Sequence, residues 1–294
     1  MKKMLVLIFV LLLLISLVLV GCKKESTEKE EGEILSLMSY NVRCFSLTGK
    51  DELTVNALTN RLPRIKDRIS WENPDVFGLQ ECIPAHYSFL CENFPEYDSH
   101  LVYRDARDIP EGTPIFWKKD KFVLLDKGAF WHSNNPEEMG PYTYVDESGE
   151  HSSLNRITTW VKLKRKSDLK EFYYFNTHMG FDHPEVVYSL DLIKSRLPKD
   201  APVLLSGDFN FSEEEREGEY YNTLTALLQD SRYAEDNMRG TKTYQGYDAE
   251  TPNEIDFIFY RNLKVKSHRV LNTDLEDFYN FASDHYAVIC EFVF

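Results

Sequence analysis

The segment Val203-Leu204-Leu205-Ser206-Gly207-Asp208-Phe209-Asn210 places a short apolar strand directly before two polar side chains, Asp208 and Asn210. By itself the segment would also suit a tight turn, because Gly, Asp and Asn favour turns. The same arrangement recurs along the chain, with a polar residue at the end of an apolar run that is typical of a strand. Strands that carry acids, amides and histidines at their ends can build a preorganised site.

The other members of this series are spread over the whole chain. They are Asn41 after Leu37–Tyr40, Glu81 after Val76–Gln80, His178 after Tyr173–Thr177, Asp256 between Ile255 and Phe257, and Asp284 with His285 before Tyr286–Ile289. Taken singly, such residues are more often turn, cap or ion-pair residues, so the prediction of a site rests on the series. Acids and histidines brought together can bind a divalent cation and transfer protons.

Apolar periodicity predicts alternating strands and helices. Strands are expected at Ile34–Arg43, Asp75–Gln80, Ile115–Trp117, Phe122–Phe130, Ile157–Leu163, Phe172–Thr177, Val203–Ser206, Glu254–Tyr260, Val265–Leu271 and Tyr286–Phe294. Helices are expected at Arg61–Trp71, after Pro84, at Pro184–Leu197 and at Tyr220–Leu228. Hairpins mixed with helices predict an α/β fold in which two sheets pack together with helices outside.

The N-terminus has the pattern of a bacterial lipoprotein signal. Lys2 and Lys3 precede an apolar run that ends in Val20-Gly21-Cys22. A transmembrane anchor is the alternative, but the run is shorter than the roughly 20 residues a span needs. We therefore expect cleavage after residue 21 and lipidation of Cys22, followed by a charged tether over residues 22–32 and one domain over 33–294. This predicts an extracytoplasmic, membrane-anchored protein.

The chain is acidic, with 34 basic and 48 acidic residues and a net charge of −14. Proteins that bind long nucleic acids through phosphates usually have the opposite sign, although net charge does not exclude a local basic patch. Beyond Cys22 the cysteines are Cys44, Cys82, Cys91 and Cys290, with no CxxC pair, so a zinc cluster is not expected. A disulfide between Cys44 and Cys82 stays open, but buried free thiols are favoured.

Taken in order, the polar-ended strands resemble the successive motifs of the endonuclease/exonuclease/phosphatase family, whose fold is DNase I-like. The matching segments are Ser39-Tyr40-Asn41-Val42-Arg43, Leu79-Gln80-Glu81, Thr113-Pro114-Ile115-Phe116-Trp117, Asn155-Arg156-Ile157-Thr158-Thr159-Trp160, Asn176-Thr177-His178, Gly207-Asp208-Phe209-Asn210, Ile255-Asp256-Phe257-Ile258 and Ser283-Asp284-His285. The resemblance covers essentially all of residues 34–294. It implies a four-layered α/β sandwich of two mostly antiparallel sheets between helices, with the site at the open end of the sheets.

The resemblance also implies a metal. Glu81 resembles the principal Mg²⁺ ligand, and Asn41 and Asp284 would lie beside it as ligands or as partners of the ligand. A hard cation that retains several waters needs only one or two carboxylates, and Mn²⁺ could replace Mg²⁺.

His285 resembles the general base, and Asp256 resembles the carboxylate that orients it. Asp208 and Asn210 resemble the pair that orients the nucleophile and holds the phosphoryl group. His178 resembles the second histidine, which donates to a phosphate oxygen. The metal and these donors would offset charge that develops on the phosphoryl oxygens.

Positions at which the sequence departs from the family's motifs narrow the branch of the family that we expect. Arg43 stands where apurinic-site endonucleases usually carry an acid, and His178 is a histidine that they lack. The chain is more similar to the branch of secreted nucleases, sphingomyelinases, inositol-phosphate phosphatases and deadenylases. A two-residue insertion between His178 and Asp182-His183 leaves the roles of those last two residues open. Arg156 could clamp a phosphate or form a strand-to-strand salt bridge.

We therefore expect a monomeric, metal-dependent phosphoester hydrolase for a modest substrate such as a phosphodiester, a sugar phosphate or a lipid headgroup. One alternative is a surface nuclease that degrades DNA or RNA, which a basic track leading from Glu81 and His285 would favour. A second alternative is a catalytically silent binding module on the same fold, and the intact set of polar residues argues against it.

Overall fold

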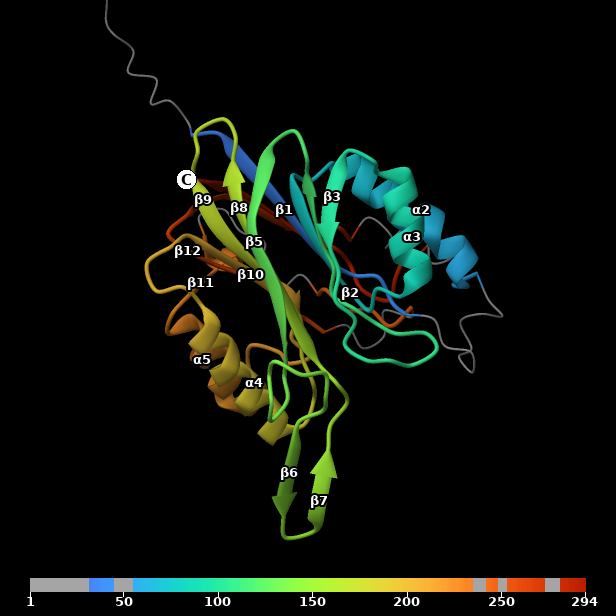
Figure 1. Cartoon of the computed structure of the whole chain (residues 1–294), viewed down its shortest axis with the longest axis vertical. Coiled ribbons are helices and arrows are strands. Elements are labelled where there is room, and N and C mark those ends of the chain that lie inside the picture. Colours follow the sequence, from blue (N-terminus) through green and yellow to red (C-terminus); the bar gives the residue numbers. More distant parts are fainter. Residues whose placement is uncertain (1–31, 45–54, 235–241, 248–252, 273–280) are drawn as a thin grey trace, which may run out of the picture. The chain divides into compact units, whose positions relative to one another are not determined.

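Two six-stranded sheets form the centre of the domain in the computed structural model. The structure describes residues 32–44, 55–234, 242–247, 253–272 and 281–294 (Figure 1). All the strands and helices that the structure describes belong to one unit, Glu33–Phe294. Cys22 and the expected signal and tether lie outside the described residues, except for Gly32.

The first sheet contains both ends of the domain. Its strand order is β13 (Lys264–Val270), β14 (Val288–Val293), β1 (Ile34–Asn41), β2 (Val76–Gln80), β4 (Ile115–Lys118) and β3 (Tyr97–His100). Ile34, at the start of β1, pairs with Val293, near the C-terminus. The N-terminus and C-terminus of the domain therefore lie side by side at the edge of the sheet from which β1 starts.

The second sheet has the order β11 (Gln229–Asp230), β12 (Asp256–Arg261), β10 (Val203–Asp208), β9 (Glu171–His178), β8 (Ile157–Arg165) and β5 (Phe122–Trp131). A separate hairpin is formed by β6 (Thr143–Asp146) and β7 (Gly149–Ser152). The ring of Tyr142 at its base stacks on Tyr188 at 4.6 Å.

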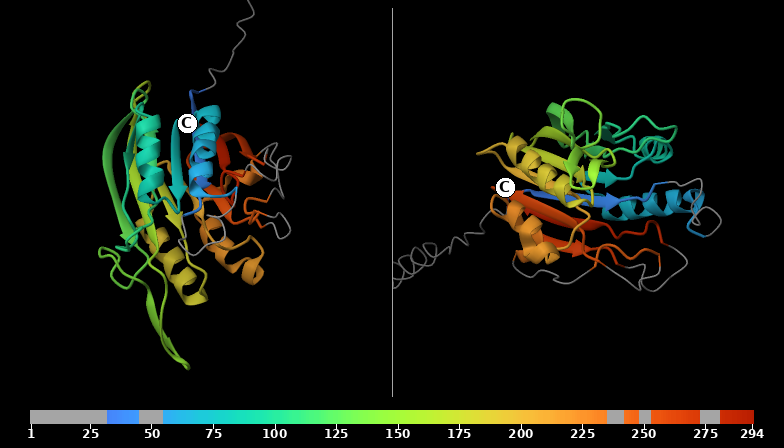
Figure 2. Two further views of the ribbon diagram at one scale, coloured as in Figure 1. Left: turned by 90° about the vertical axis from the view of Figure 1, so that its right-hand side faces the viewer. Right: turned by 90° about the horizontal axis from the view of Figure 1, so that it is seen from below.

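Helices cover the outer face of each sheet. They are α2 (Leu58–Glu72) and α3 (Pro84–Asn93) on the first sheet, and α4 (His183–Arg196) and α5 (Glu219–Thr225) on the second, with short 3-10 turns η2 (Glu215–Gly218) and η3 (Ser231–Tyr233). The α2 sequence repeats buried residues at Arg61, Ile65 and Ile69, one face of a helix. The two helix pairs lie outside the strands in the turned views (Figure 2).

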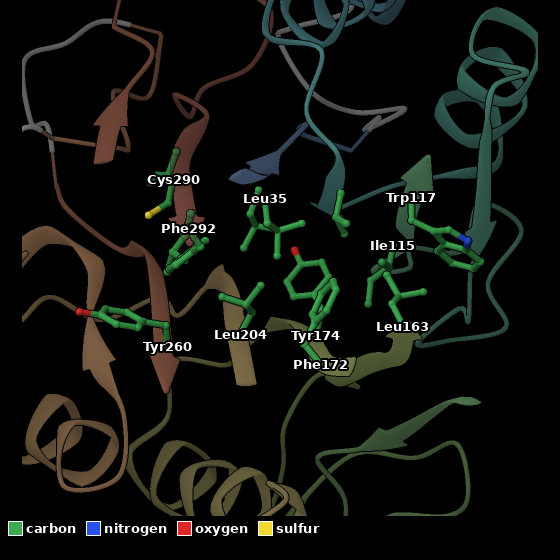
Figure 3. Packing of buried hydrophobic residues seen from close by; sticks show 14 of the residues in the cluster. Leu35, Ile115, Trp117, Leu163, Phe172, Tyr174, Leu204, Tyr260, Cys290 and Phe292 are labelled. Carbon is green, nitrogen blue, oxygen red and sulfur yellow. The ribbon is translucent and has the colours of Figure 1, made fainter. Parts of the chain in front are cut away.

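Three hydrophobic clusters hold these layers together. One lies between α2, α3 and the first sheet, a second between α4, α5 and the second sheet, and a third between the two sheets. In the third, Leu35 of β1 and Ile115 of β4 point toward Leu204 of β10 and Tyr174 of β9 (Figure 3). The order helix, sheet, sheet, helix confirms the predicted four-layered α/β sandwich.

The only parallel pairs of the two sheets, among the described residues, are β1 with β2 and β9 with β10. Parallel strands end at the same edge of a sheet, so their polar C-terminal residues come together. In these pairs Asn41 is level with Gln80, and Asp208 is level with His178. The strands also face each other across the core, because β1 contacts β10 and β2 contacts β9.

Every strand and helix expected from the periodicity is present, with ends that differ by a few residues. The strands β3, β6, β7 and β11 were not predicted, because their sequences are short or polar. Within the described part of the chain, no helix is long and apolar enough to cross a bilayer. Cys44, Cys82, Cys91 and Cys290 are free thiols, but Cys91 is exposed and Cys44 half-buried, so the expectation of burial holds only for the other two.

Candidate active site

A cavity of about 500 Å³ opens where the parallel pairs of both sheets end. Its lining is mostly polar and comes from distant parts of the sequence. The lining residues are Arg43, Cys44, Glu81, Arg104, Glu111, Arg156, His178, Phe181, Asp208, Asn210, Tyr244, Asn253, Ile255, Asp284 and His285. Glu81 and His285, which come from opposite ends of the chain, therefore share one pocket.

Glu81 follows directly after β2 and is fixed by its neighbours. Its backbone adopts a left-handed conformation, with φ at 56°, which is uncommon outside glycine and concentrates at functional sites. Its carboxylate accepts hydrogen bonds from the backbone N–H of Cys44 at 2.8 Å and from Nδ2 of Asn41 at 3.2 Å. Burial alone would raise the pKa of Glu81, but the Cys44 N–H and the Arg43 guanidinium hold it below its usual range.

Asn41 lies beneath the pocket and links its two sides. It is fully buried. Its Nδ2 donates to Glu81 and, at 2.9 Å, to Oδ2 of Asp208, while its Oδ1 accepts from the backbone N–H of Arg43. In this orientation the amide brings two carboxylates together and keeps its oxygen on the backbone.

His285 is held by carboxylates on both sides. Its Nδ1 lies 2.8 Å from Oδ2 of Asp256, the first residue of β12, and its Nε2 lies 3.6 Å from Oδ2 of Asp208. Burial would lower the pKa of His285, but these two carboxylates raise it to about 10. Burial raises the pKa of Asp208 to about 7, against the opposing charge of His285.

His178 is an acceptor, because its partner can only donate. Nη1 of Arg156 lies 2.9 Å from Nε2 of His178, and a guanidinium has no acceptor atom. Burial and the Arg156 charge hold the pKa of His178 well below its usual range, so the imidazole is neutral. Since Nε2 is occupied in this way, the group with N–H to offer to a phosphate here is Arg156, which His178 orients.

Asp284 and Asn210 complete the predicted set. Asp284 lines the pocket and lies 3.5 Å from Nε of Arg43. Asn210 has φ at 55°, and its Nδ2 is bound to the carbonyl oxygen of Met179 at 2.8 Å. The two residues left open by the insertion lie elsewhere: Asp182 is the N-cap residue of α4, and Nδ1 of His183 contacts the Tyr220 hydroxyl at 2.7 Å.

Several lining residues were not predicted. Arg104 and Glu111 come from an irregular segment between β3 and β4, where no strand precedes them as a signal. Phe181 belongs to the insertion after His178; its ring is 65% exposed and lies 5.2 Å from the guanidinium carbon of Arg156. Tyr244 packs edge-on against the ring of His285 at 5.0 Å.

The donor set fits a divalent cation. Glu81, Asp208 and Asp284 are carboxylates around one pocket, and Asp208, Asp256 and His285 offer ligand atoms within 4.8 Å of one another. Crowded carboxylates repel one another unless a cation neutralises them. Oxygen ligands of this kind suit Mg²⁺ or Mn²⁺. Glu81 also belongs to a second group of possible ligands, with Cys44 and Glu111, whose ligand atoms lie within 4.8 Å of one another.

Comparison with known proteins decides the family. A sequence model of the endonuclease/exonuclease/phosphatase family matches residues 38–285, nearly the whole domain. The chain belongs to this family. Its members are phosphoester hydrolases, including nucleases and phosphatases, and usually use a divalent metal. The matched range includes all the polar strand ends noted in the sequence, from Asn41 to His285.

Similar family proteins act on different substrates. A mannosyl-6-phosphatase of Bacteroides thetaiotaomicron has a similar structure, with a TM-score of 0.76 and 28% identity over 88% of this chain and 100% of that one. Nocturnin of Drosophila melanogaster is 24% identical over 89% of this chain, which spans only 47% of nocturnin. Human tyrosyl-DNA phosphodiesterase 2 is 22% identical over 90% of this chain and 70% of its own length.

Proposed function

We propose that this chain is a Mg²⁺-dependent hydrolase of small phosphoesters that uses a histidine-assisted attack of water on phosphorus. The observation that carries the proposal is the 2.8 Å contact between His285 and Asp256 in the same pocket as Glu81. A histidine oriented by a buried carboxylate is a proton-transfer device, and a carboxylate beside it suits a metal. A silent binding module would have no need for this arrangement.

Some side chains of the pocket would act on the attacking water, and others would act on the phosphoryl group. His285 takes the proton of the attacking water, and Asp256 keeps the proton-bearing Nδ1 in place and stabilises the imidazolium. Asp208, 3.6 Å from Nε2 of His285, helps to orient the water. Mg²⁺ held by Glu81, with Asp284 nearby, would polarise the phosphoryl oxygens and oppose protonation of His285.

The phosphoryl group would be held by the remaining donors of the pocket. Arg156 is buried and is oriented by His178, so its free N–H groups can meet phosphoryl oxygens without reorganising. Asn210 lines the same pocket next to Asp208. Guanidinium groups match phosphate geometry well, which supports the reading of Arg156 as a phosphate clamp over that of a strand salt bridge.

A small substrate is supported by the placement of the positive charges. Arg43, Arg104 and Arg156 lie in the pocket itself, and the last two are more than nine-tenths buried. A nuclease needs cations along an open surface to hold a strand by its phosphates. The similarity to a mannosyl-6-phosphatase supports the same class, a sugar phosphate or a related small ester.

A substrate screen tests the proposal. The purified full chain would be assayed on a phosphomonoester, a phosphodiester, sphingomyelin, DNA and RNA, each with Mg²⁺, with Mn²⁺ and with chelator. We expect metal-dependent release of phosphate from a small ester, faster than any digestion of long nucleic acid at physiological salt. Efficient plasmid digestion with a steep salt dependence would establish the nuclease instead. Absence of turnover on all of these substrates would favour the catalytically silent binding module.

We also propose that the chain acts as a monomer outside the cytoplasm, tethered to a membrane through a lipid on Cys22. The support is the apolar run that ends in Val20-Gly21-Cys22. Cys22→Ala should release the protein from the membrane fraction or leave its signal uncleaved. Unchanged fractionation and migration of this variant would contradict the anchor.

A further inference from the structure

The segment between β3 and β4 is fastened to both sheets next to the pocket. Cys82, the residue after Glu81, pairs with Gly112 through two backbone hydrogen bonds of 2.9 and 3.1 Å. A Cβ atom on Gly112 would lie 2.7 Å from the carbonyl oxygen of Val102, so only glycine permits this close approach. This end of the segment is therefore fixed beside the principal metal ligand.

The other end of the segment is fixed beside Arg156. The carbonyl oxygen of Arg104 accepts hydrogen bonds from Nε1 of Trp131 and Nδ2 of Asn155, both at 3.0 Å. The N–H of Arg104 donates to the carbonyl oxygen of Glu111 at 2.7 Å, which closes the segment into a hairpin. Arg104 is thus held rigidly between the Glu81 and Arg156 sides of the pocket.

The side chain of Arg104 is anchored at one edge and has buried, unpaired N–H groups at another. Its Nη2 lies 2.7 Å from Oε2 of Glu111, and its Nε lies 3.4 Å from Asp105 without a hydrogen bond. Its Nη1 is buried and has no partner among the described residues. Arg104 is only 6% exposed, and leaving a buried N–H of a charged group unpaired is costly.

Arg156 shows the same feature in the same pocket. It is 3% exposed, and its Nε has no hydrogen-bond partner. Burial and the charge of Arg104 lower the pKa of Arg156, and the carboxylates of Glu185, Asp208 and Glu81 oppose this only in part, so the charges of the two guanidinium groups interact. Two buried guanidinium groups with unpaired N–H groups in one pocket call for an oxyanion between them.

From this geometry we infer that Arg104 and Arg156 form a subsite for a terminal phosphate and that Arg104 makes the enzyme prefer phosphomonoesters. The inference rests on the proposed hydrolase function. A terminal phosphate is nearly dianionic at neutral pH and has three oxygens that are free to be bound. Its oxygens can meet the metal side, Asn210 and the two arginines at once. A phosphodiester has one charge and only two such oxygens, so its second ester group would meet the arginines.

The test compares two esters and one ion on the full-length, Mg²⁺-loaded protein. Kinetics would be measured with p-nitrophenyl phosphate and bis(p-nitrophenyl) phosphate, and inorganic phosphate binding by calorimetry. In Arg104→Gln we expect kcat/KM for the monoester and the affinity for phosphate to fall about 10- to 100-fold, as for loss of a hydrogen bond to a charged group. The diester rate should fall much less, so the monoester preference shrinks.

Arg107→Gln is the matched control. Arg107 contacts the same carboxylates, Asp105 at 2.8 Å and Glu111 at 2.6 Å, but its side chain is 56% exposed and does not line the pocket. We expect changes below about fivefold, as for an exposed ion pair. Equal loss in Arg107→Gln would show that the hairpin, and not Arg104, carries the effect, and would overturn the inference.

Other outcomes separate this inference from the proposed function. Equal loss on both esters in Arg104→Gln, or unchanged phosphate affinity, overturns the subsite while hydrolysis stands. If the wild type hydrolyses neither ester, the proposed function fails, and the phosphate titration still decides the subsite. Should Arg104→Gln unfold, Arg104→Lys keeps the charge for Glu111 but loses the paired N–H groups. We expect it to lower monoester preference in the same direction, and an unchanged preference counts against the inference.

Discussion

Nδ1 of His285 and Oδ2 of Asp256 lie 2.8 Å apart, although the two residues stand 29 positions apart in the sequence. Asp256 begins β12 and is level with Asp208 across the sheet, so the histidine sits between two carboxylates from neighbouring strands. The short contact fixes which nitrogen carries the proton and directs Nε2 toward the pocket. The catalytic part of the proposal depends on this pair.

The first prediction concerns that pair. Asp256→Asn removes the charge that stabilises the imidazolium and allows the wrong tautomer of His285. We expect kcat to fall about 10²- to 10⁴-fold, in the range of lost general-base catalysis. Binding of Mg²⁺, measured by calorimetry, should change little, because Asp256 is not the proposed principal ligand. A variant with wild-type kcat would show that His285 is not the base.

The second prediction concerns the metal. Mg²⁺ should raise the melting temperature of the wild type, because a ligand that binds only the folded state stabilises it, and EDTA should reverse the shift. In Glu81→Gln the affinity for Mg²⁺ should drop at least about tenfold and the shift should shrink accordingly. His285→Ala serves as the control, with turnover lost and the Mg²⁺ shift retained. If both variants keep the shift, the metal binds elsewhere.

The third prediction concerns the strand end that carries Asp208. A Cβ atom on Gly207 would lie 2.0 Å from the carbonyl oxygen of Thr177 on β9. Gly207→Ala must therefore push β9 and β10 apart, and we expect a loss of about 2–4 kcal/mol in the free energy of unfolding. Gly140→Ala is the control, because its nearest heavy atom would be 4.0 Å away. Urea denaturation of both variants measures the difference.

The fourth prediction concerns acid sensitivity. His132 is fully buried, its Nε2 lies 2.8 Å from Oγ1 of Thr158, and burial, with Arg156 adding, lowers its pKa from 6.5 to about 3. Below pH 6.5 the unfolded chain therefore binds a proton at His132, whereas the folded chain does not bind it until the pH falls to about 3. Stability from this residue is complete above pH 6.5 and is lost as the pH falls toward 3, by up to about 1.4 kcal/mol per pH unit.

His132→Gln tests this, since glutamine keeps a polar contact to Thr158 but does not titrate. Between pH 6 and pH 4 the free energy of unfolding of this variant should fall less steeply than that of the wild type. The difference in slope should correspond to the uptake of about one proton on unfolding. Identical slopes in wild type and His132→Gln would assign the acid sensitivity to other groups.

The fold was predictable because its core strands are apolar runs with polar ends. Val203–Asp208 is buried along its whole length, and the run Val203–Ser206 showed this in the sequence. The hairpin of β6 and β7 gave no such signal, because Thr143–Asp146 and Gly149–Ser152 are polar and half-exposed. The two strands are held by hydrogen bonds between their backbones and by stacking of Tyr142 on Tyr188. Neither contact produces a periodic pattern of apolar residues in the sequence.

The sequence predicted which residues form the site better than it predicted which of them donate and which accept hydrogen bonds. Residues at strand ends, such as Glu81 and His285, were placed by the pattern of the strands. Which way a hydrogen bond runs depends on partners that only folding brings near. His178 becomes an acceptor because Arg156, 22 residues earlier, donates to it. Arg104 was missed because it follows no regular strand and reaches the pocket through the contacts of Trp131 and Asn155 with its carbonyl oxygen.

The direction of β1 has a consequence for how the enzyme would meet its substrate. The strand starts at Ile34, next to the C-terminus, and ends at Asn41 under the pocket. Its eight residues span about 26 Å at the usual rise of a strand. The residues that precede β1 therefore join the domain at the end of the strand that lies away from the pocket. Whatever the chain is attached to through these residues, the attachment leaves the Asn41 end of β1, and the pocket above it, clear of the point of connection.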